Sequence, residues 1–270
     1  MAPERESRCA MYTHPEAVRR QALLKEWATK NGIRAVLFDL DDTLVGTSPV
    51  IRELEERYVQ YVASQQPALS PQDVLTTLRK EDASVFASHS VSKARWSALA
   101  HRLVDTYGKN TEETFHQGLA IFMSLYSIIP PLLPGATDTV AQLRCIAEKM
   151  GVVTHADEYW TDMKLHRTGL STHFDHVHIV PDDGHKDSKH WKQAIEALGV
   201  APQEVLVIGD SIRGDIQAAR EAGVRHLVLV PSQWAPYGSG TLPDGVITVS
   251  GIGKTVDALI DSLTPPRIIP

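Results

Sequence analysis

The sequence has few cysteines, and neither of them is placed for a metal site. Its 270 residues include only Cys9 and Cys145, and no second metal-ligand residue lies at motif spacing from either one. A zinc-ribbon type of site is therefore excluded, and the composition gives no disulfide framework. We expect a chain with reduced cysteines, located in the cytoplasm.

Long apolar runs and an excess of basic charge are also missing. No apolar stretch has the length of a bilayer span, and the first residues, Met1 to Glu6, lack the apolar core of a signal peptide. The 27 lysines and arginines are outnumbered by 33 aspartates and glutamates, which gives a net charge of -6 without a basic stripe. We therefore expect neither a membrane nor a nucleic acid as partner.

What the sequence does contain is an alternation of short apolar runs and helical patterns. Hydrophobic residues make up 43% of the chain, which is enough for a sizeable core. Strands that are apolar throughout and separated by helices are typical of a parallel sheet covered on both faces. This pattern predicts an α/β fold with a doubly wound, Rossmann-like parallel sheet. The expected strands begin with the run that ends at Asp39 and continue at 152–154, 176–180, 205–209, 226–230 and 246–249. The helices expected among these strands lie at 136–149, 157–170, 188–198, 216–222 and 255–263.

One long stretch interrupts this alternation. About 85 residues after Leu44 show helical patterns and no convincing strand, with proline-containing helix starts at Ser48-Pro49 and Ser70-Pro71. Two further helices are expected near 92–107 and 111–127. We predict an all-α cap domain at 46–133, inserted into a core domain of 34–45 and 134–270. Residues 1–33 form an N-terminal extension with one helix, from His14 to Thr29, packed on the core.

The first strand ends in a cluster of acidic residues. Asp39, Asp41 and Asp42 follow the apolar run within four positions, and carboxylates this close repel one another unless a cation or a proton compensates them. Taken alone, the cluster also fits a solvated acidic loop in which Asp42 or Thr43 caps a helix. The remainder of the chain decides between the two interpretations.

Other strand ends supply matching groups. Ligands of open parallel sheets bind beyond the carboxyl ends of the strands, where the strand order reverses. The groups expected there are four carboxylates, one hydroxyl and one ammonium: Asp39, Asp41, Asp210, Asp215, Thr154 and Lys186. The carboxylates suit a hard divalent cation, most simply Mg²⁺. This cation, Thr154 and Lys186 would then neutralise a phosphoryl group.

These residues resemble the four motifs of the haloacid dehalogenase superfamily. The matching segments, in order, are Asp39-Leu40-Asp41-Asp42-Thr43, Val152-Val153-Thr154, Lys186, and Gly209-Asp210-Ser211-Ile212-Arg213-Gly214-Asp215. The resemblance covers roughly residues 34–265. The helical insert after the first motif is similar to the α-helical cap that many members carry there.

The resemblance implies a role for each acid of the first motif. Asp39 would be the nucleophile that forms an aspartyl-phosphate, and Asp41 would act as general acid and then as general base. An extended chain would point these alternate side chains the same way. Because an acid two residues after the nucleophile is needed for phosphate esters and not for attack on carbon, Asp41 favours a phosphatase over a dehalogenase.

The resemblance also implies the remaining site. The Asp39 side chain, the Asp41 carbonyl and Asp210 would hold Mg²⁺, with Asp215 as a further ligand or an anchor for one. Thr154 would donate to the phosphate, and Lys186 would contact both the phosphate and Asp39. His155 is expected at the mouth of the site, as a substrate-binding residue.

Two departures from the family pattern leave alternatives open. The residue after Thr154 is often Asn in the family and is His155 here. The motif lysine is often followed by proline, whereas Lys186 precedes Asp187, so Lys189 could take its place; we favour Lys186.

Some residues outside the motifs admit a functional interpretation. Seven of the twelve histidines lie between His155 and His190, and His176 and His178 share one strand face. Their spacing matches no zinc motif, so surface and strand-end positions are the favoured interpretation. Lys93, Arg95 and Trp96 on a cap helix, and Trp234 and Tyr237 near the site edge, could touch a substrate, but packing explains them equally or better.

The sequence therefore predicts a Mg²⁺-dependent phosphohydrolase of a small phosphorylated metabolite. Two alternatives stay open: a phosphomutase or other phosphotransferase of the same superfamily, and a binding module with the same fold but without turnover. Neither the substrate nor the choice between monomer and homodimer follows from the sequence.

Overall fold

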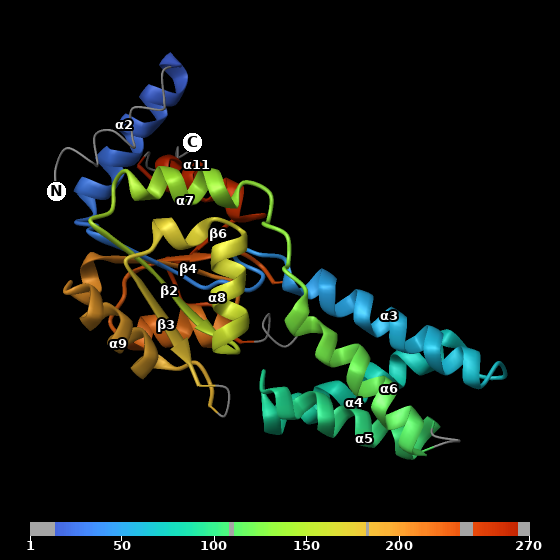
Figure 1. Ribbon diagram of the computed structural model, residues 1–270. Helices are drawn as coiled ribbons and strands as arrows, with labels where there is room; N and C mark the ends of the chain where they lie inside the picture. Colours follow the sequence, from blue (N-terminus) through green and yellow to red (C-terminus); the bar gives the residue numbers. More distant parts are fainter. Residues whose placement is uncertain (1–13, 108–110, 182–183, 233–239, 264–270) are drawn as a thin grey trace, which may run out of the picture.

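A six-stranded parallel sheet forms the centre of the molecule. The computed structural model describes residues 14–107, 111–181, 184–232 and 240–263. The strand order is β3-β2-β1-β4-β5-β6, and every pair is parallel (Figure 1). The strands are β1 (Ala35–Phe38), β2 (Lys149–His155), β3 (His176–Val180), β4 (Val205–Gly209), β5 (His226–Leu229) and β6 (Ile247–Thr248). The doubly wound parallel sheet that the sequence predicts is confirmed.

Strand β1 is buried on both faces. Phe38 lies in register with Val152 on one side and Ile208 on the other. Successive side chains of a strand point to opposite faces. Accordingly, Val36 and Phe38 belong to one hydrophobic cluster and Ala35 and Leu37 to a second. This explains why the strand is apolar throughout rather than alternating.

Helices cover both faces of the sheet. The first face carries α2 (Pro15–Lys30), α7 (Ala136–Arg144), α8 (Glu158–Arg167) and α11 (Thr255–Asp261), which contribute to the cluster around Phe38. The opposite face carries α9 (Ser188–Leu198) and α10 (Ala218–Glu221). Figure 1 shows α7 and α11 on one side of the sheet and α9 on the other. Helix α2 is the predicted N-terminal helix, and it packs on the core as expected.

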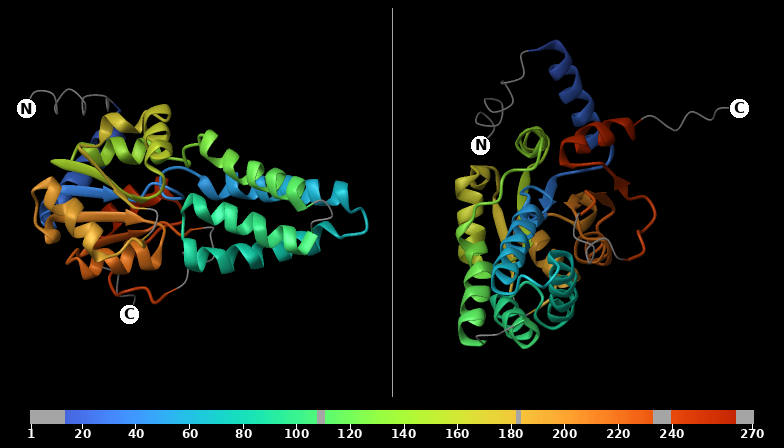
Figure 2. Two further views of the ribbon diagram at one scale, coloured as in Figure 1. Left: turned by 60° about the horizontal axis from the view of Figure 1, so that its bottom comes forward. Right: turned by 90° about the vertical axis from the view of Figure 1, so that its right-hand side faces the viewer.

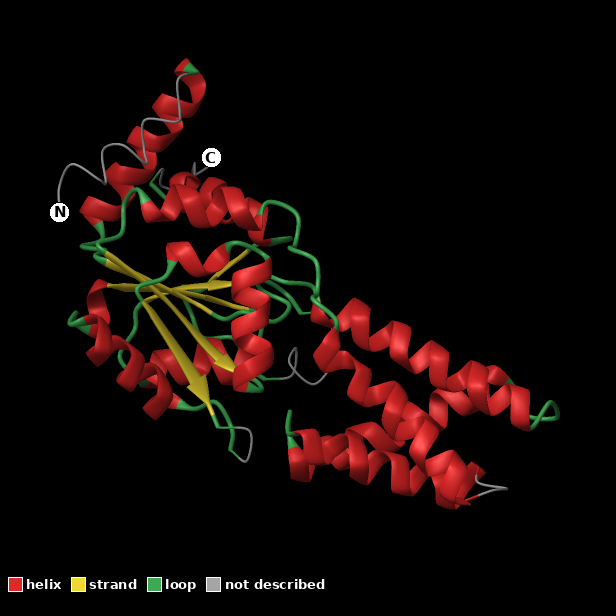
Figure 3. Cartoon of the chain, in the orientation of Figure 1, coloured by secondary structure: helices red, strands yellow, loops and turns green. Residues whose placement is uncertain are grey.

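A separate group of helices packs around a third hydrophobic cluster. It consists of α3 (Thr47–Gln65), α4 (Pro71–His89), α5 (Lys93–Tyr107) and α6 (Thr111–Met123), here called the helical bundle. Figures 2 and 3 show the bundle beside the sheet, on the side toward which the strands point. The two connections to the core run side by side, because Gly46 N donates to Pro131 O (2.8 Å) and Leu133 N to Leu44 O (2.9 Å).

Several predicted element boundaries are wrong. Helix α3 begins at Thr47, not after a Ser48 cap, because the Ser48 amide and hydroxyl both donate to Asp42. The helix expected at 136–149 ends at Arg144, since Lys149 already pairs with Ala35 in the sheet. The helix expected at 216–222 begins earlier, with a π-helical turn at Ile212–Gln217.

Several smaller differences lie at helix ends. The helix expected at 111–127 ends at Met123 and continues as a 3₁₀ turn, Ser124–Ser127. Helix α8 is shorter than the expected 157–170, with Asp157 as its N-cap. The last helix ends at Asp261 rather than at 263. In each case the apolar residues of the sequence keep their helical spacing beyond the last residue whose backbone is hydrogen-bonded as a helix.

Trp27 tests whether α2 belongs to the core. Its side chain is 3% exposed, its Nε1 donates to Ser262 Oγ (3.0 Å), and its ring meets His226 edge-on. Trp27→Ala should lower the free energy of unfolding by about 3–5 kcal/mol, because it leaves a cavity between α2 and the sheet. Urea denaturation measures the loss.

Ser262→Ala is the control, because it removes the hydroxyl that accepts from Trp27 and donates to Leu259 O but leaves the tryptophan ring in place; it should cost about 1–2 kcal/mol. A Trp27→Ala cost no larger than that of the control would show that α2 does not contribute to the core.

Candidate active site

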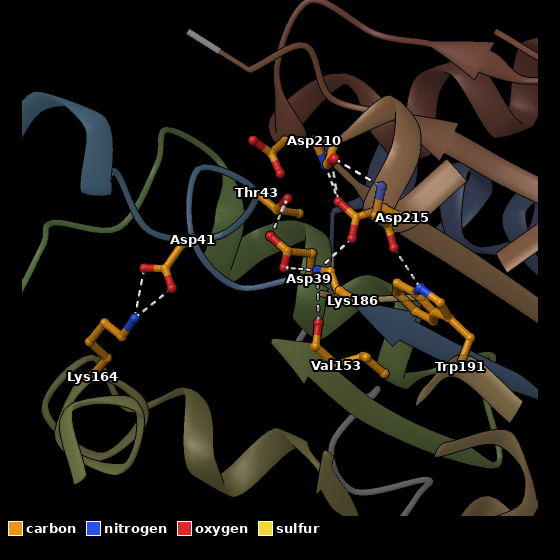
Figure 4. A network of polar contacts seen from close by, with 11 residues as sticks. Asp39, Asp41, Thr43, Val153, Lys164, Lys186, Trp191, Asp210 and Asp215 are labelled. Carbon is orange, nitrogen blue, oxygen red and sulfur yellow. Dashed lines mark hydrogen bonds and ion pairs between the residues drawn. The ribbon is translucent and has the colours of Figure 1, made fainter. Parts of the chain in front are cut away.

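The carboxylate of Asp39 lies at the end of β1 and is buried. The Asp39 amide donates to Ile208 O (2.9 Å), so the chain stays against β4 for one residue beyond the strand. The side chain is held at both oxygens: Oδ1 lies 2.5 Å from Lys186 Nζ, and Oδ2 accepts from Thr43 Oγ1 at 3.0 Å (Figure 4). Two fixed contacts leave the carboxylate one orientation.

Asp215 approaches from the end of β4. It lies in the π-helical turn, and its Oδ2 accepts from the amides of Asp210 (3.0 Å) and Ser211 (2.8 Å). Its Oδ1 lies 2.5 Å from Lys186 Nζ. A Cβ atom at Gly209 would come within 2.5 Å of the Asp215 side chain. Glycine is therefore required at the end of β4 for the carboxylate to lie so close to the backbone.

The three carboxylates of Asp39, Asp210 and Asp215 form one buried cluster. Each offers an oxygen within 4.8 Å of the others, and Lys186 lies between two of them. Burial raises the pKa of Asp39 to about 7 and raises the pKa of Asp210 well above its usual range, and neighbouring carboxylates add to both effects. Burial alone would lower the pKa of Lys186, but the charges of Asp215 and Asp39 outweigh it and raise that pKa.

The donor set fits a divalent cation. Among the described residues, Asp210 Oδ2 is buried without a hydrogen-bond partner, and Lys186 contacts the other two carboxylates of the cluster, Asp39 and Asp215. Carboxylate oxygens are the ligands that Mg²⁺ prefers in proteins.

Strand β2 ends in the two polar residues that the sequence singled out. Thr154 is 1% exposed, and its Oγ1 has no hydrogen-bond partner in the part of the chain that the structure describes. An unpaired buried hydroxyl costs free energy, which a bound acceptor would recover. His155 Nε2 is also buried and unpaired, and burial lowers the pKa of His155 to about 4, with a further contribution from Lys186. The imidazole is therefore neutral at pH 7.

Asp41 contacts a lysine that sequence reasoning missed. Lys164 Nζ on α8 lies 2.7 and 2.6 Å from the two Asp41 oxygens, and Thr47 Oγ1 also donates to that carboxylate. The Lys164 side chain is fully buried, and its Nζ lies 3.9 Å from the centre of the Trp160 ring.

Asp39 and Asp41 contact different lysines (Figure 4). The extended backbone of the strand ends at Asp42, which has a φ of 60°. The sequence did contain a signal for Lys164. Its helical spacing from Asp157 and Trp160 places all three residues on one face of α8.

Lys186, not Lys189, lies beside Asp39. The Lys189 side chain is 68% exposed, and Asp187, at 3.9 Å, is the one acidic partner that it has among the described residues. His176 and His178 have ring centres 6.2 Å apart. Among the described residues, the acidic cluster is the only group of three or more side chains placed to hold a metal. Trp234 and Tyr237 lie outside the described residues.

A cavity lies between the first motif and the helical bundle. Asp41, Asp42 and His155 line it from the core, and Arg95 and Trp96 line it from α5. Its volume of about 70 Å³ gives room for roughly five water molecules. Arg95 and Trp96 are packed in the bundle and at the same time form part of the cavity wall.

The geometry combines a parallel sheet with a buried carboxylate that is held by a lysine, next to an acidic cluster that fits a cation. Residues 33–223 match the family described as haloacid dehalogenase-like hydrolase, and the chain belongs to that family. It is therefore a hydrolase of that family, and the sequence relatives that follow are named as phosphatases.

Two relatives and one solved structure document the similarity. The glyceraldehyde 3-phosphate phosphatase of Pyrococcus furiosus is 26% identical over 211 residues, which cover 76% of this chain and 82% of the relative. The phosphoglycolate phosphatase of Escherichia coli K12 is 29% identical over 205 residues, covering 71% and 79%. A haloacid dehalogenase-like hydrolase from Xanthomonas campestris has the same fold, with a TM-score of 0.67 at 16% identity, covering 86% and 97%.

None of the described helices combines the length and the apolar character needed to cross a membrane.

A double-mutant cycle tests the contact between Lys164 and Asp41. Lys164→Met and Asp41→Asn should each lower the free energy of unfolding by about 1–3 kcal/mol, because each leaves a charged partner without its counter-charge. The double variant should cost about 1–2 kcal/mol less than the sum, since neither charge then remains unpaired. Chemical denaturation gives all three values.

Lys189→Met is the matched control, because that lysine is exposed; its effect should stay within about 0.5 kcal/mol. Additive losses for Lys164→Met and Asp41→Asn would contradict the ion pair.

Proposed function

We propose that the protein is a Mg²⁺-dependent phosphatase that hydrolyses the phosphate ester of a small metabolite through an aspartyl-phosphate on Asp39. The observation that carries this proposal is the fixed Asp39 carboxylate, bound by Lys186 and Thr43 at the sheet edge where Thr154 Oγ1 has no partner. An oriented carboxylate next to an unused donor and a buried ammonium suits attack on a phosphoryl group.

The phosphate group of the substrate takes up the unused donors. Thr154 Oγ1 donates to one phosphate oxygen, and Lys186 lies close enough to Asp39 to contact both the nucleophile and the phosphate. An ammonium held by two carboxylates stays charged throughout the reaction. It therefore keeps Asp39 available as a nucleophile and offsets charge that develops on phosphorus.

The reaction then runs in two transfers. An Asp39 oxygen attacks phosphorus, the bond from phosphorus to the ester oxygen breaks, and the ester oxygen takes a proton from Asp41. Water next attacks the phosphorus of the aspartyl-phosphate and gives its proton to Asp41, which releases inorganic phosphate and restores Asp39. For the first transfer, Asp41 exchanges its contact with Lys164 for the ester oxygen; it already lines the cavity on that side.

Mg²⁺ would be held by Asp39, the Asp41 carbonyl and Asp210. When bound, it supplies positive charge that offsets the cluster and the phosphate. We assign Asp215 the role of an anchor, because its Oδ2 already accepts two amides and its Oδ1 contacts Lys186. Within this proposal Asp215 positions Lys186 and the turn that presents Asp210.

We propose that residues 46–133 are a cap domain on a core of 34–45 and 134–270, with 1–33 as an extension. The paired connections at Gly46 and Leu133 would form the hinge about which the cap moves relative to the core. Polar contacts join the bundle region to α8: Lys93 Nζ lies 2.6 Å from Asp157 Oδ2, and Trp160 Nε1 donates to Ile128 O at 2.8 Å. A cap held this way would exclude water from the cavity.

Asp39→Asn should abolish turnover. Purified protein with Mg²⁺ and a panel of phosphate esters should release inorganic phosphate, and the variant should lose about 10³-fold or more of this activity, since an amide is a poor nucleophile. A chelator should abolish the activity of the wild-type protein reversibly.

Asp73→Asn, an exposed change on α4, is the matched control and should retain full activity. Phosphate release by Asp39→Asn at the wild-type rate would rule out Asp39 as the nucleophile. An isomerised sugar phosphate without free phosphate would instead indicate a phosphomutase.

The raised pKa of Asp39 predicts how Mg²⁺ stabilisation depends on pH. The pKa is about 7 in the folded protein and 3.8 ordinarily, so between these values the folded state holds a proton that the unfolded chain has released. Without metal, the free energy of unfolding contributed by Asp39 therefore falls as the pH rises through this range. Because Mg²⁺ binds the ionised carboxylates, it should raise Tm more at pH 8 than at pH 5.5.

Thermal denaturation at both pH values, with and without saturating Mg²⁺, measures the effect, which can reach about 3 kcal/mol at 100-fold excess over Kd. Asp210→Asn should remove most of it. A Tm increase that is equal at both pH values, or larger at pH 5.5, would contradict binding to this cluster.

A further inference from the structure

The wall of the cavity beside Asp41 is mainly apolar. The described lining includes aromatic and aliphatic side chains from the bundle helices, from the turns that adjoin them and from α8: Phe86, Val91, Trp96, Leu125, Tyr126 and Trp160. Trp96, Leu125 and Trp160 are almost fully buried. In the proposed reaction Asp41 protonates the leaving oxygen, so whatever is attached to that oxygen has to occupy this cavity.

The charged groups of the wall already have partners in the protein. Arg95 Nε lies 2.7 Å from Asp82 Oδ1, a second guanidinium nitrogen also binds Asp82, and the rings of Trp96 and Phe86 lie within 4.8 Å of the guanidinium carbon. Asp157 is bound to Lys93 at 2.6 Å. A carboxylate on the leaving group would therefore have to displace a protein carboxylate to reach a cation.

The remaining polar groups add little capacity for a charged or hydroxylated ligand. The hydroxyls of Thr47 and Ser48 donate to Asp41 and Asp42, respectively. His155 Nε2 has no hydrogen-bond partner among the described residues and can bind one hydroxyl, but its ring is neutral at pH 7 because burial lowers the pKa of His155, so it does not attract a carboxylate by charge. Each further hydroxyl of a polar leaving group would give up its hydration without gaining an equivalent partner.

We infer that the cavity selects phosphate esters of small apolar alcohols, with a leaving group of about five carbon atoms. The size follows from room for roughly five water molecules. This inference rests on the proposed function and narrows its substrate class. It sets this chain apart from the relatives named for glyceraldehyde 3-phosphate and phosphoglycolate, whose leaving groups carry an aldehyde and hydroxyl or a carboxylate.

A matched pair of esters tests the inference. In 2-methylbutyl phosphate, methyl groups replace the two hydroxyls of glycerol 3-phosphate, so the two esters have the same number of non-hydrogen atoms in the same arrangement. The wild-type protein with Mg²⁺ should show a kcat/KM for 2-methylbutyl phosphate about 10–100-fold above that for glycerol 3-phosphate. Acetyl phosphate has a short leaving group that occupies little of the cavity. Its hydrolysis therefore measures the phosphatase reaction independently of the preference for a leaving group.

Val91→Thr supplies a test that keeps the volume of the wall. The change replaces one methyl group by a hydroxyl in the turn between α4 and α5, where it does not disturb a helix. It should lower the preference for 2-methylbutyl phosphate about 3–10-fold, mainly by raising KM for that ester. Val18→Thr, the same substitution on the exposed face of α2, should leave the preference unchanged.

The outcomes separate the inference from the function on which it rests. If acetyl phosphate is hydrolysed but glycerol 3-phosphate is cleaved as well as or better than 2-methylbutyl phosphate, the inferred preference for apolar leaving groups is wrong and the proposed phosphatase function is retained. The same conclusion follows if acetyl phosphate is the only one of the three that is hydrolysed. If none of the three releases phosphate, the proposed function fails and the substrate class fails with it.

Discussion

Three carboxylates buried around one ammonium are the constraint on which the site depends. Asp39 and Asp215 both lie 2.5 Å from Lys186 Nζ, and Asp210 completes the cluster without a partner for its Oδ2. Buried charges of one sign are tolerated only when an opposite charge or a proton compensates them. The glycine at 209 and the π-helical turn follow from this need, because they bring Asp215 against the end of β4.

A second lysine organises the side of the site that faces the bundle. Lys164 binds Asp41 through both carboxylate oxygens, and Asp157 and Trp160 on the same face of α8 contact Lys93 and Ile128. One helix therefore touches both the proposed proton donor and the bundle. A displacement of the bundle relative to the core would act on α8 and, through Lys164, on Asp41.

The acidic cluster could be predicted from the sequence because topology brings it together. Asp39 and Asp210 directly follow β1 and β4, and the ends of neighbouring parallel strands meet at one edge whatever the details of packing. The lysine beside Asp39 could be narrowed to Lys186 or Lys189, since the strand before it was recognised but the start of α9 was uncertain by a few residues.

The partners of Asp41 could not be predicted in the same way. They depend on how α8 packs beside the loop that follows β1, where Lys164 contacts Asp41. The predicted helix ends were wrong for a related reason. The end of α7 is set by the pairing of Lys149 with Ala35 in the sheet, a long-range contact that cannot be predicted from local periodicity. The cavity likewise arises only when the bundle and α8 meet.

The most direct test of the account is to find the covalent intermediate. The protein is mixed with Mg²⁺ and excess phosphate ester, quenched in acid within one turnover, digested and analysed by mass spectrometry. The account predicts a phosphorylated peptide that contains Asp39, with fragment ions that place the phosphoryl group on that residue and no such peptide from Asp39→Asn. Rapid phosphate release by the wild-type protein with the phosphoryl group on another residue would contradict it.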